Sequence, residues 1–217
     1  MRYKSNFSEM KNHYEKKYHR IVHKNLLENE KYYLFRAKLS KTYWKCFNGN
    51  VLEFGCGLGQ NIFLNKDKSI GIEVSEFCIK ECEKRGIKVF NNISKVKNKV
   101  NGVLCVHVLE HLRDPDKVLK DFNKVLEDNG VLVLVLPESG KNKIYKDFKP
   151  DIGKHLFGWN FNHINELLYA NGFRIMKNEF NYGYGYSVFY KYFLGDKLIK
   201  LLGRIMGRRE MIVVARK

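Results

Sequence analysis

The stretch Val51-Leu52-Glu53-Phe54-Gly55-Cys56-Gly57-Leu58-Gly59-Gln60 decides the fold of this 217-residue chain. A short apolar run meets three alternating glycines, and a helix is expected to begin near Gly59. Because glycine has no Cβ and adopts positive φ, such a loop lets backbone N–H groups approach a polar ligand at the positive end of a helix. The pattern therefore predicts a strand, a turn and a helix that together bind a nucleotide-like ligand.

Two acidic residues stand at or just after the ends of the first two predicted strands. Glu53 stands near the end of the first predicted strand, and Glu73 follows the second, eighteen residues after Gly55. An acid at this spacing can bind both hydroxyls of a ribose. Gln60 occupies the position where a dinucleotide-binding loop needs its third glycine, so the pattern departs from that fingerprint.

The run from Val51 to Gly59 closely resembles the first motif of class I S-adenosylmethionine-dependent methyltransferases, which usually reads V-L-[DE]-x-G-C-G-x-G. The segment from His107 to Pro115 resembles the L-E-H-x-x-D-P segment of the same family. The resemblance is continuous and ordered from Val51 to Glu138. It implies S-adenosylmethionine as the cofactor and an α/β fold with a single doubly wound, mostly parallel seven-stranded sheet, in the order 3-2-1-4-5-7-6, with helices on both faces.

We expect one methyltransferase domain over residues 1–217. Its predicted parts are a helical N-terminal lid (1–48), a cofactor-binding core (49–138) and a substrate-side half (139–217) with a helical insertion at 185–208. In the core, Ser75 is expected to cap one helix, Asp114 to begin another and Gly130 to end it. Within the lid, the resemblance makes three residues candidates for holding the methionine carboxylate: Arg36, Tyr14 and Tyr18. A solvated arginine and two half-buried tyrosines are the alternative.

The resemblance also implies a set of cofactor-binding residues: Glu53, Gly55, Cys56, Gly57, Glu73, Val74, Asn92, Ile93 and His107. Asn92 is a departure, because the family commonly has an aspartate there. Its amide oxygen can still accept a hydrogen bond from the adenine amine, although a plain loop asparagine is an equal alternative.

Methyl transfer from a sulfonium is an in-line displacement, so a protein accelerates it by holding donor and nucleophile in line and by removing a proton where the nucleophile carries one. His111 and His155 are the candidate bases, and a structural histidine is the alternative for each. Together with His107 and Glu110 they resemble the metal-binding E-x-x-E-H plus histidine set of small-RNA 2′-O-methyltransferases and some quinone O-methyltransferases. Three imidazoles and one carboxylate could bind a divalent ion of the zinc or cobalt type. Because His107 replaces the first glutamate and ordinary relatives carry L-E-H without a metal, we assign no metal ligand, and metal binding by these four residues stays an open alternative.

The amino-acid composition indicates which classes of partner and which compartment suit the protein. Forty Lys and Arg against twenty-three Asp and Glu give a net charge of +17, which attracts polyanions such as nucleic acid or an anionic membrane. Five scattered cysteines without a C-x-x-C pair, and a start without an apolar leader, predict a soluble cytoplasmic protein with reduced thiols. The oligomeric state is not indicated.

Three functions follow from these features. We favour methyl transfer to an O or N nucleophile of a small molecule or of a glycan- or lipid-type acceptor. An RNA methyltransferase is the alternative suggested by the charge and by a group of lysines at 141, 143, 146, 149 and 154. A noncatalytic S-adenosylmethionine-binding protein is the third. Residues 190–208 are expected to form an amphipathic helix that covers the substrate side or touches an anionic membrane.

Overall fold

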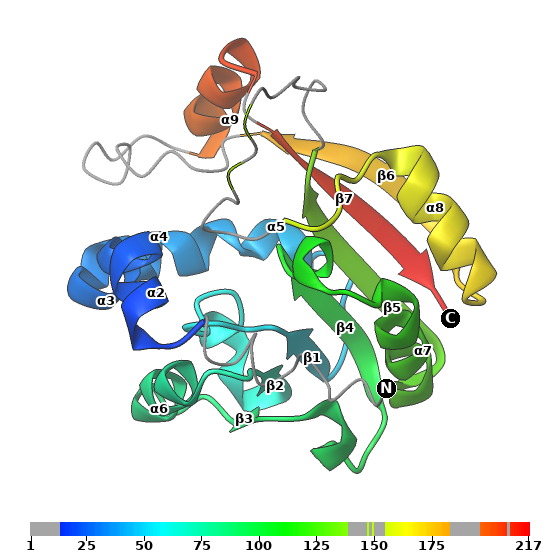
Figure 1. Cartoon of the computed structure of the whole chain (residues 1–217), viewed down its shortest axis with the longest axis horizontal. Helices are drawn as coiled ribbons and strands as arrows, with labels where there is room; N and C mark the ends of the chain where they lie inside the picture. Colours follow the sequence, from blue (N-terminus) through cyan, green and yellow to red (C-terminus); the bar gives the residue numbers. More distant parts are fainter. Residues whose placement is uncertain (1–13, 139–146, 148, 150–154, 183–195, 208) are drawn as a thin grey trace. The chain divides into compact units, whose positions relative to one another are not determined.

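The computed structural model describes residues 14–138, 147, 149, 155–182, 196–207 and 209–217. Its strands form one seven-stranded sheet in the order β3-β2-β1-β4-β5-β7-β6, as the sequence predicts. Contacts within the chain divide it into two compact units, residues 1–98 and 99–217, which are described in turn below. Figure 1 labels the helices and strands of the chain.

In the first unit, the described residues form four short helices and then a parallel part of the sheet. The helices are α2 (Lys16–Val22), α3 (Lys24–Glu28), α4 (Glu30–Leu39) and α5 (Lys41–Trp44). The segment before the first strand is thus helical where it is described, and its role as a lid stays a prediction. Strand β1 (Val51–Phe54) pairs parallel with β2 (Ser69–Ile72), which pairs parallel with β3 (Val89–Phe90). Helix α6 (Glu76–Lys84) connects β2 to β3, and the short 3-10 helix η2 (Ile93–Lys95) follows β3.

The helix expected near Gly59 is absent, and this prediction was wrong. Turns lead instead into a 3-10 helix, η1 (Phe63–Lys68), with non-helical backbone at Asn65. In an α-helix the carbonyl of Asn61 would accept from the N–H of Asn65. Here that carbonyl accepts from Trp44 Nε1 at 2.7 Å and from Ser40 Oγ at 3.1 Å, so α5 and the end of α4 take the acceptor that a helix would need.

Helix α6 forms as its sequence dictates. Ser75 caps it, because its Oγ accepts a hydrogen bond from the N–H of Cys78. Gly86 ends it with φ of 70°, a conformation that glycine adopts without strain. Its apolar face packs into a buried cluster that contains Cys82, Cys56, Ile62 and Ile87.

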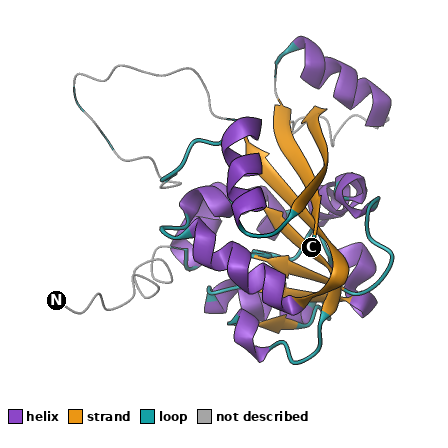
Figure 2. Cartoon of the chain, turned by 90° about the vertical axis from the view of Figure 1, so that its right-hand side faces the viewer, coloured by secondary structure: helices purple, strands orange, loops and turns teal. Residues whose placement is uncertain are grey.

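The second unit is built on long central strands. Strand β4 (Val100–Val106) pairs parallel with β5 (Leu126–Pro137), whereas β7 (Arg209–Arg216) runs antiparallel to both β5 and β6 (Arg174–Tyr182). The sheet is therefore mixed rather than mostly parallel, because its last hairpin reverses the chain. Figure 2 shows these strands in orange with the helices in purple. The run from Val131 to Leu136 is almost entirely buried, as the sequence of a central strand predicts.

The remaining elements of this unit are the 3-10 helix η3 (Leu109–His111) and the helices α7 (Pro115–Val125), α8 (Phe161–Ala170) and α9 (Asp196–Ile205). Asp114 caps α7 through the N–H of Lys117. Helix α7 ends at Val125, and β5 begins at Leu126, four residues before Gly130, so the predicted end at Gly130 was wrong. Leu126 already pairs with Val100, and the register shifts before Gly102 pairs with Val131.

Helix α9 lies within the predicted insertion, while residues 183–195 and 208 lie outside the described part. The insertion itself stays a prediction. Several apolar side chains of α9 are exposed, with fractions of 41% for Leu198, 53% for Leu201 and 73% for Ile205. None of the described helices is long and apolar enough to cross a membrane. In the lysine-rich stretch, Lys149 is exposed, and Lys141, Lys143, Lys146 and Lys154 lie outside the described residues.

Candidate functional site

The glycine loop after β1 is a backbone cradle. Gly55, Gly57 and Gly59 have φ of 71°, 53° and 75°, which are conformations that other residues adopt only with strain. The N–H groups of Gly55 and Cys56 donate to the carbonyl of Ile72, so the loop is fastened to the end of β2.

Two of these glycines have different surroundings. A Cβ on Gly59 would lie 2.5 Å from Ile87 Cδ1, so this glycine allows close packing. A Cβ on Gly57 would meet nothing within 4 Å. Open space therefore lies beside Gly57, as close approach of a ligand to the backbone requires.

Glu73 lies against this loop. Its carboxylate accepts hydrogen bonds from the backbone N–H groups of Gly57 (2.8 Å), Val74 (2.7 Å) and Ser75 (2.9 Å). Burial raises the pKa of Glu73, whereas these hydrogen bonds oppose the shift. Two carboxylate oxygens offer about four acceptor sites, so the group retains capacity for a further donor.

Glu53 is the more deeply buried acid. Its side chain is fully buried, and Oε1 accepts a hydrogen bond from Asn61 Nδ2 at 2.6 Å. Oε2 has no hydrogen-bond partner among the described residues. Burial raises the pKa of Glu53 to about 8, Asn61 opposes this, and the charge of Glu73 adds to it. An unpartnered buried carboxyl oxygen suits a ligand that brings its own donor.

The other predicted cofactor residues of this unit line the same strand ends. Cys56 is buried, and Val74 and Ile93 are half-buried. The side chain of Asn92 is exposed and accepts from the N–H of Ser94, so it caps η2. The structure thus brings Glu53, the glycines and Glu73 together and gives Asn92 a local structural contact.

Two residues that precede β1 and belong to none of the sequence motifs form hydrogen bonds with the glycine loop and with the start of α6. Tyr33, fully buried in α4, donates from its hydroxyl to the carbonyl of Leu58, and the guanidinium of Arg85 lies 3.7 Å from the centre of its ring. The carboxylate of Glu15 accepts from the N–H groups of Glu76 and Phe77 at the start of α6. Neither residue belongs to a motif, so only the three-dimensional contacts reveal them.

Arg36, Tyr14 and Tyr18, the predicted candidates for holding the methionine carboxylate, make contacts with neighbouring side chains. Arg36 Nη1 donates to the hydroxyl of Tyr32 at 3.4 Å. The rings of Tyr14 and Tyr18 meet edge to face at 4.9 Å. His19 packs beside Tyr18, and burial lowers the pKa of His19 to about 4. Their proposed role toward a methionine carboxylate stays a prediction.

In the second unit, His107 directly follows β4 and has a φ of 53°. Its Nε2 lies 2.9 Å from Glu210 Oε2, and its Nδ1 lies 3.6 Å from Glu110 Oε1. Burial alone would lower the pKa of His107, but the two glutamates outweigh it and raise the pKa to about 9. Glu210, which also accepts from Asn181 Nδ2, was missed by the sequence analysis because it lies 103 residues away.

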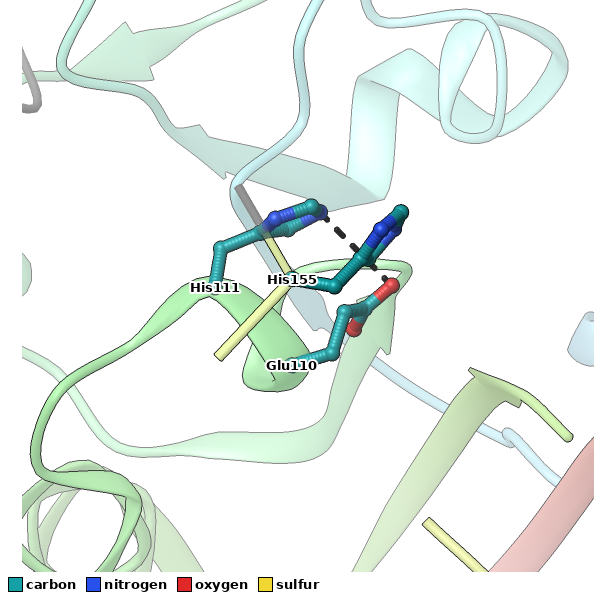
Figure 3. Close-up of side chains that lie close together, drawn as sticks. All are labelled: Glu110, His111 and His155. Carbon is teal, nitrogen blue, oxygen red and sulfur yellow. Dashed lines mark ion pairs between the residues drawn. The ribbon is translucent and has the colours of Figure 1, made fainter. Parts of the chain in front are cut away.

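The two candidate bases lie side by side next to Glu110. The imidazole rings of His111 and His155 stack with their centres 4.8 Å apart, and His111 Nε2 lies 3.7 Å from Glu110 Oε1 (Figure 3). The N–H groups of Leu156 and Phe157 donate to the backbone carbonyl of Glu110, so the segment that carries His155 is fixed to η3. The structure therefore brings together the two predicted histidines from distant parts of the chain.

Comparison with known proteins also indicates a methyltransferase. Residues 10–178 match the family model of a methyltransferase domain. No curated protein matches the sequence significantly. Similar solved structures include an S-adenosylmethionine-dependent methyltransferase from Thermotoga maritima, described as a possible histamine N-methyltransferase; it is 16% identical, with a TM-score of 0.64, and the match covers 96% of this chain and 99% of that one.

Two further structures share the fold. A methyltransferase from Archaeoglobus fulgidus is 19% identical, with 89% of this chain and 97% of that one covered and a TM-score of 0.58. The magnesium protoporphyrin IX methyltransferase of Synechocystis PCC 6803, solved with bound S-adenosylmethionine, is 12% identical, with 98% and 97% covered and a TM-score of 0.61.

The strand order, the glycine loop after β1 and the acid after β2 define a Rossmann-like methyltransferase fold. The chain belongs to the methyltransferase-domain family, the class I S-adenosylmethionine-dependent methyltransferases. The predicted family, and with it S-adenosylmethionine as the cofactor, is confirmed.

Proposed function

We propose that the protein transfers a methyl group from S-adenosylmethionine to an O or N nucleophile of a small molecule or of a glycan- or lipid-type acceptor. The observation that carries the proposal is the carboxylate of Glu73 in the glycine loop, hydrogen-bonded to Gly57. An acid held there is placed to accept from ribose hydroxyls, and the open space beside Gly57 admits a ligand against the backbone.

In this proposal each residue of the first unit has a distinct task. Glu73 binds the ribose, and Gly55 and Gly57 allow the backbone to approach the ligand. The unpartnered oxygen of Glu53 accepts from a polar group of the cofactor. Cys56, Val74 and Ile93 line the adenosine, and Asn92 accepts from the adenine amine through remaining acceptor capacity. The cofactor role of His107, which belongs to the second unit, stays a prediction.

S-adenosylmethionine supplies a methyl group on a sulfonium, which a nucleophile displaces in line. An O–H or N–H nucleophile must also lose a proton, and we assign proton removal to the imidazole of His111 or His155. Their rings stack on each other next to the buried side chain of Glu110, and imidazole is a common general base in enzymes. This arrangement favours an acceptor with a titratable nucleophile over a carbon centre.

Two further observations support the proposed acceptor class and the proposed compartment. The solved relatives from Thermotoga maritima and Synechocystis carry names of small-molecule methyltransferases, and each match covers nearly the full length of both chains. All five cysteines are free, and four of them are buried, which agrees with a reducing compartment such as the cytoplasm.

One observation favours a peripheral membrane contact for the enzyme. Leu198, Leu201 and Ile205 of α9 are exposed, and Met206, with 59% of its surface exposed, continues the apolar surface. Arg204 in the same helix is also exposed. An exposed apolar face beside basic residues is typical of helices that lie in an anionic lipid interface, which would suit a lipid-type acceptor.

Incubation of the purified protein with methyl-labelled S-adenosylmethionine and fractionated cell extracts tests the proposal. We expect label in the small-molecule, glycan or lipid fraction, and much less of it with a Glu73→Gln variant when S-adenosylmethionine is kept near the wild-type dissociation constant. Label in RNA that nuclease removes would replace this proposal by the RNA methyltransferase. Binding of S-adenosylmethionine without label in any fraction would favour the noncatalytic protein.

A further inference from the structure

We propose that Glu110, His111 and His155 bind a divalent transition-metal ion of the zinc type. One potential ligand atom from each of these three residues lies within 4.8 Å of the other two. Figure 3 shows the three side chains gathered at one point, with the two imidazoles beside the carboxylate. The site holds independently of whether the protein transfers a methyl group.

The backbone, and not only the side chains, builds this cluster. Glu110 and His111 are adjacent in η3, and the backbone carbonyl of Glu110 accepts from the N–H groups of Leu156 at 2.8 Å and Phe157 at 3.1 Å. These two bonds fix the segment that begins at His155 against η3. A site whose ligands stand on anchored backbone loses less conformational freedom when an ion binds.

The strongest indication is the state of the Glu110 carboxylate. Glu110 is fully buried, and neither of its carboxylate oxygens has a hydrogen-bond partner among the described residues. His107 and His111 approach Oε1 only to 3.6 and 3.7 Å, which are ion-pair distances too long for hydrogen bonds. A buried carboxylate is normally hydrogen-bonded, paired or bound to a metal, because burying it alone is costly.

His107 does not fully compensate Glu110, because it is also engaged by a second buried acid. Its Nε2 lies 2.9 Å from Glu210, which is itself buried. One imidazole ring is thus shared between two buried acids, and its approach to Glu110, at 3.6 Å, is the longer of the two. A divalent cation beside Glu110 would give its carboxylate oxygens the partner that they lack among the described residues.

The donor types select the ion. Two imidazoles and one carboxylate suit zinc, cobalt or nickel, whereas magnesium and calcium prefer oxygen ligands alone. Zinc–ligand distances of about 2.0–2.2 Å in a tetrahedron imply ligand atoms roughly 3.5 Å apart, so the cluster must contract by about 1 Å. His155 is exposed and can turn to achieve this. Three protein ligands leave a coordination position open, as in catalytic zinc sites.

Metal binding and general-base catalysis exclude each other for the same imidazole lone pair. If the ion is bound, His111 and His155 hold it rather than remove a proton. A bound ion would therefore take the place of proton removal as the role of the two histidines, and the cofactor site of the first unit would stay as proposed.

Titration of the full-length protein with Co²⁺ and Zn²⁺ tests the site. The protein should carry no polyhistidine tag, should be stripped with chelator, and should have the exposed Cys46 changed to serine to remove a competing ligand. We expect one equivalent of Co²⁺ to give the visible absorption of a tetrahedral site and Zn²⁺ to displace it. Zn²⁺ should also raise the melting temperature, and Mg²⁺ at the same concentration should not.

Variants locate the ion. His155→Ala, at an exposed position, should fold and should weaken Zn²⁺ affinity at least tenfold, and Glu110→Gln should do the same. His163→Ala is the matched control, because His163 is an exposed histidine in α8 of the same unit. Unchanged affinity in His155→Ala, or an equal loss in His163→Ala, would overturn the proposal. Weak binding of several equivalents of Zn²⁺, without one tight equivalent, would overturn the proposal as well.

Discussion

Glu73 Oε2 accepts a hydrogen bond of 2.8 Å from the backbone N–H of Gly57, so the acid after the second strand and the glycine loop after the first form one structural unit. The first prediction follows from this contact. Glu73→Gln removes the charge while it keeps the size of the side chain. Hydrogen bonds to a charged group contribute about 1.5–3 kcal/mol, so affinity for S-adenosylmethionine should fall about 10- to 150-fold.

Isothermal titration calorimetry measures this change. Glu30→Gln is the control, because Glu30 is an exposed acid of the same unit that pairs with Arg85. We expect the control to bind as the wild type does. If Glu73→Gln binds equally well, Glu73 takes no part in the site.

The second prediction separates ligand approach from backbone strain. Gly57 and Gly86 both have positive φ, and each alanine variant should lose roughly 1–2 kcal/mol of folding stability for this reason. A Cβ at Gly57 would enter the open space beside the loop, whereas a Cβ at Gly86 would meet only the flexible end of Lys66.

Thermal unfolding and calorimetry together should show similar losses of stability but loss of cofactor binding in Gly57→Ala alone. Equal binding by the two variants would show that the space beside Gly57 is not used.

The third prediction concerns pH and Glu53. Its pKa is raised in the folded protein to about 8, so between pH 4.5 and 8 the folded state binds more protons than the unfolded state. Stability contributed by protonated Glu53 is therefore present below about pH 4.5 and is lost as pH rises through about 8. The loss is on the order of a few kcal/mol.

Urea unfolding at pH 5, 6.5 and 8 should show that the wild type loses more stability with rising pH than Glu53→Gln does. His19, whose pKa is lowered, acts in the opposite direction in both proteins, so the difference between them isolates Glu53. A Glu28→Gln control removes an exposed carboxylate and should follow the wild type. Parallel pH profiles of the wild type and Glu53→Gln would contradict the assignment.

The fourth prediction tests the exposed face of α9. Vesicles with anionic lipid should bind the protein at low ionic strength, and binding should fade as salt screens the basic residues. Leu201→Gln combined with Ile205→Gln should abolish binding, since both side chains are more than half exposed. Tyr169→Gln, at an exposed aromatic position in α8, is the control. Vesicle binding that the double variant retains would rule out this face.

The family resemblance predicted the strand order, and local sequence patterns predicted the positions of most core elements. The buried run from Val131 to Leu136 is uniformly apolar, and Ser75 and Asp114 cap the helices that they were expected to cap. Predictions failed where a distant contact overrides the local pattern. The carbonyl of Asn61 is taken by Ser40 and Trp44, and no local pattern indicates that the turn after Gly59 then forgoes an α-helix.

In the candidate site, too, features with a local pattern could be predicted and features set by distant contacts could not. The glycine loop and Glu73 could be predicted from the sequence because their spacing is short and regular. Glu210 and Tyr33 could not be predicted, because each belongs to an ordinary strand or helix and meets its partner, His107 or Leu58, only through a hydrogen bond between segments distant in sequence. The neighbourhood of His111 and His155 lies between these cases: the residue types suggested chemistry, but the backbone bonds from Leu156 and Phe157 to Glu110 could not be predicted.

Direct binding of S-adenosylmethionine to the wild-type protein tests the central claim most directly. Calorimetry should show one equivalent bound, with S-adenosylhomocysteine competing for the same site and NAD producing no heat. Absence of binding by S-adenosylmethionine, or tighter binding of NAD at the glycine loop, would contradict the account.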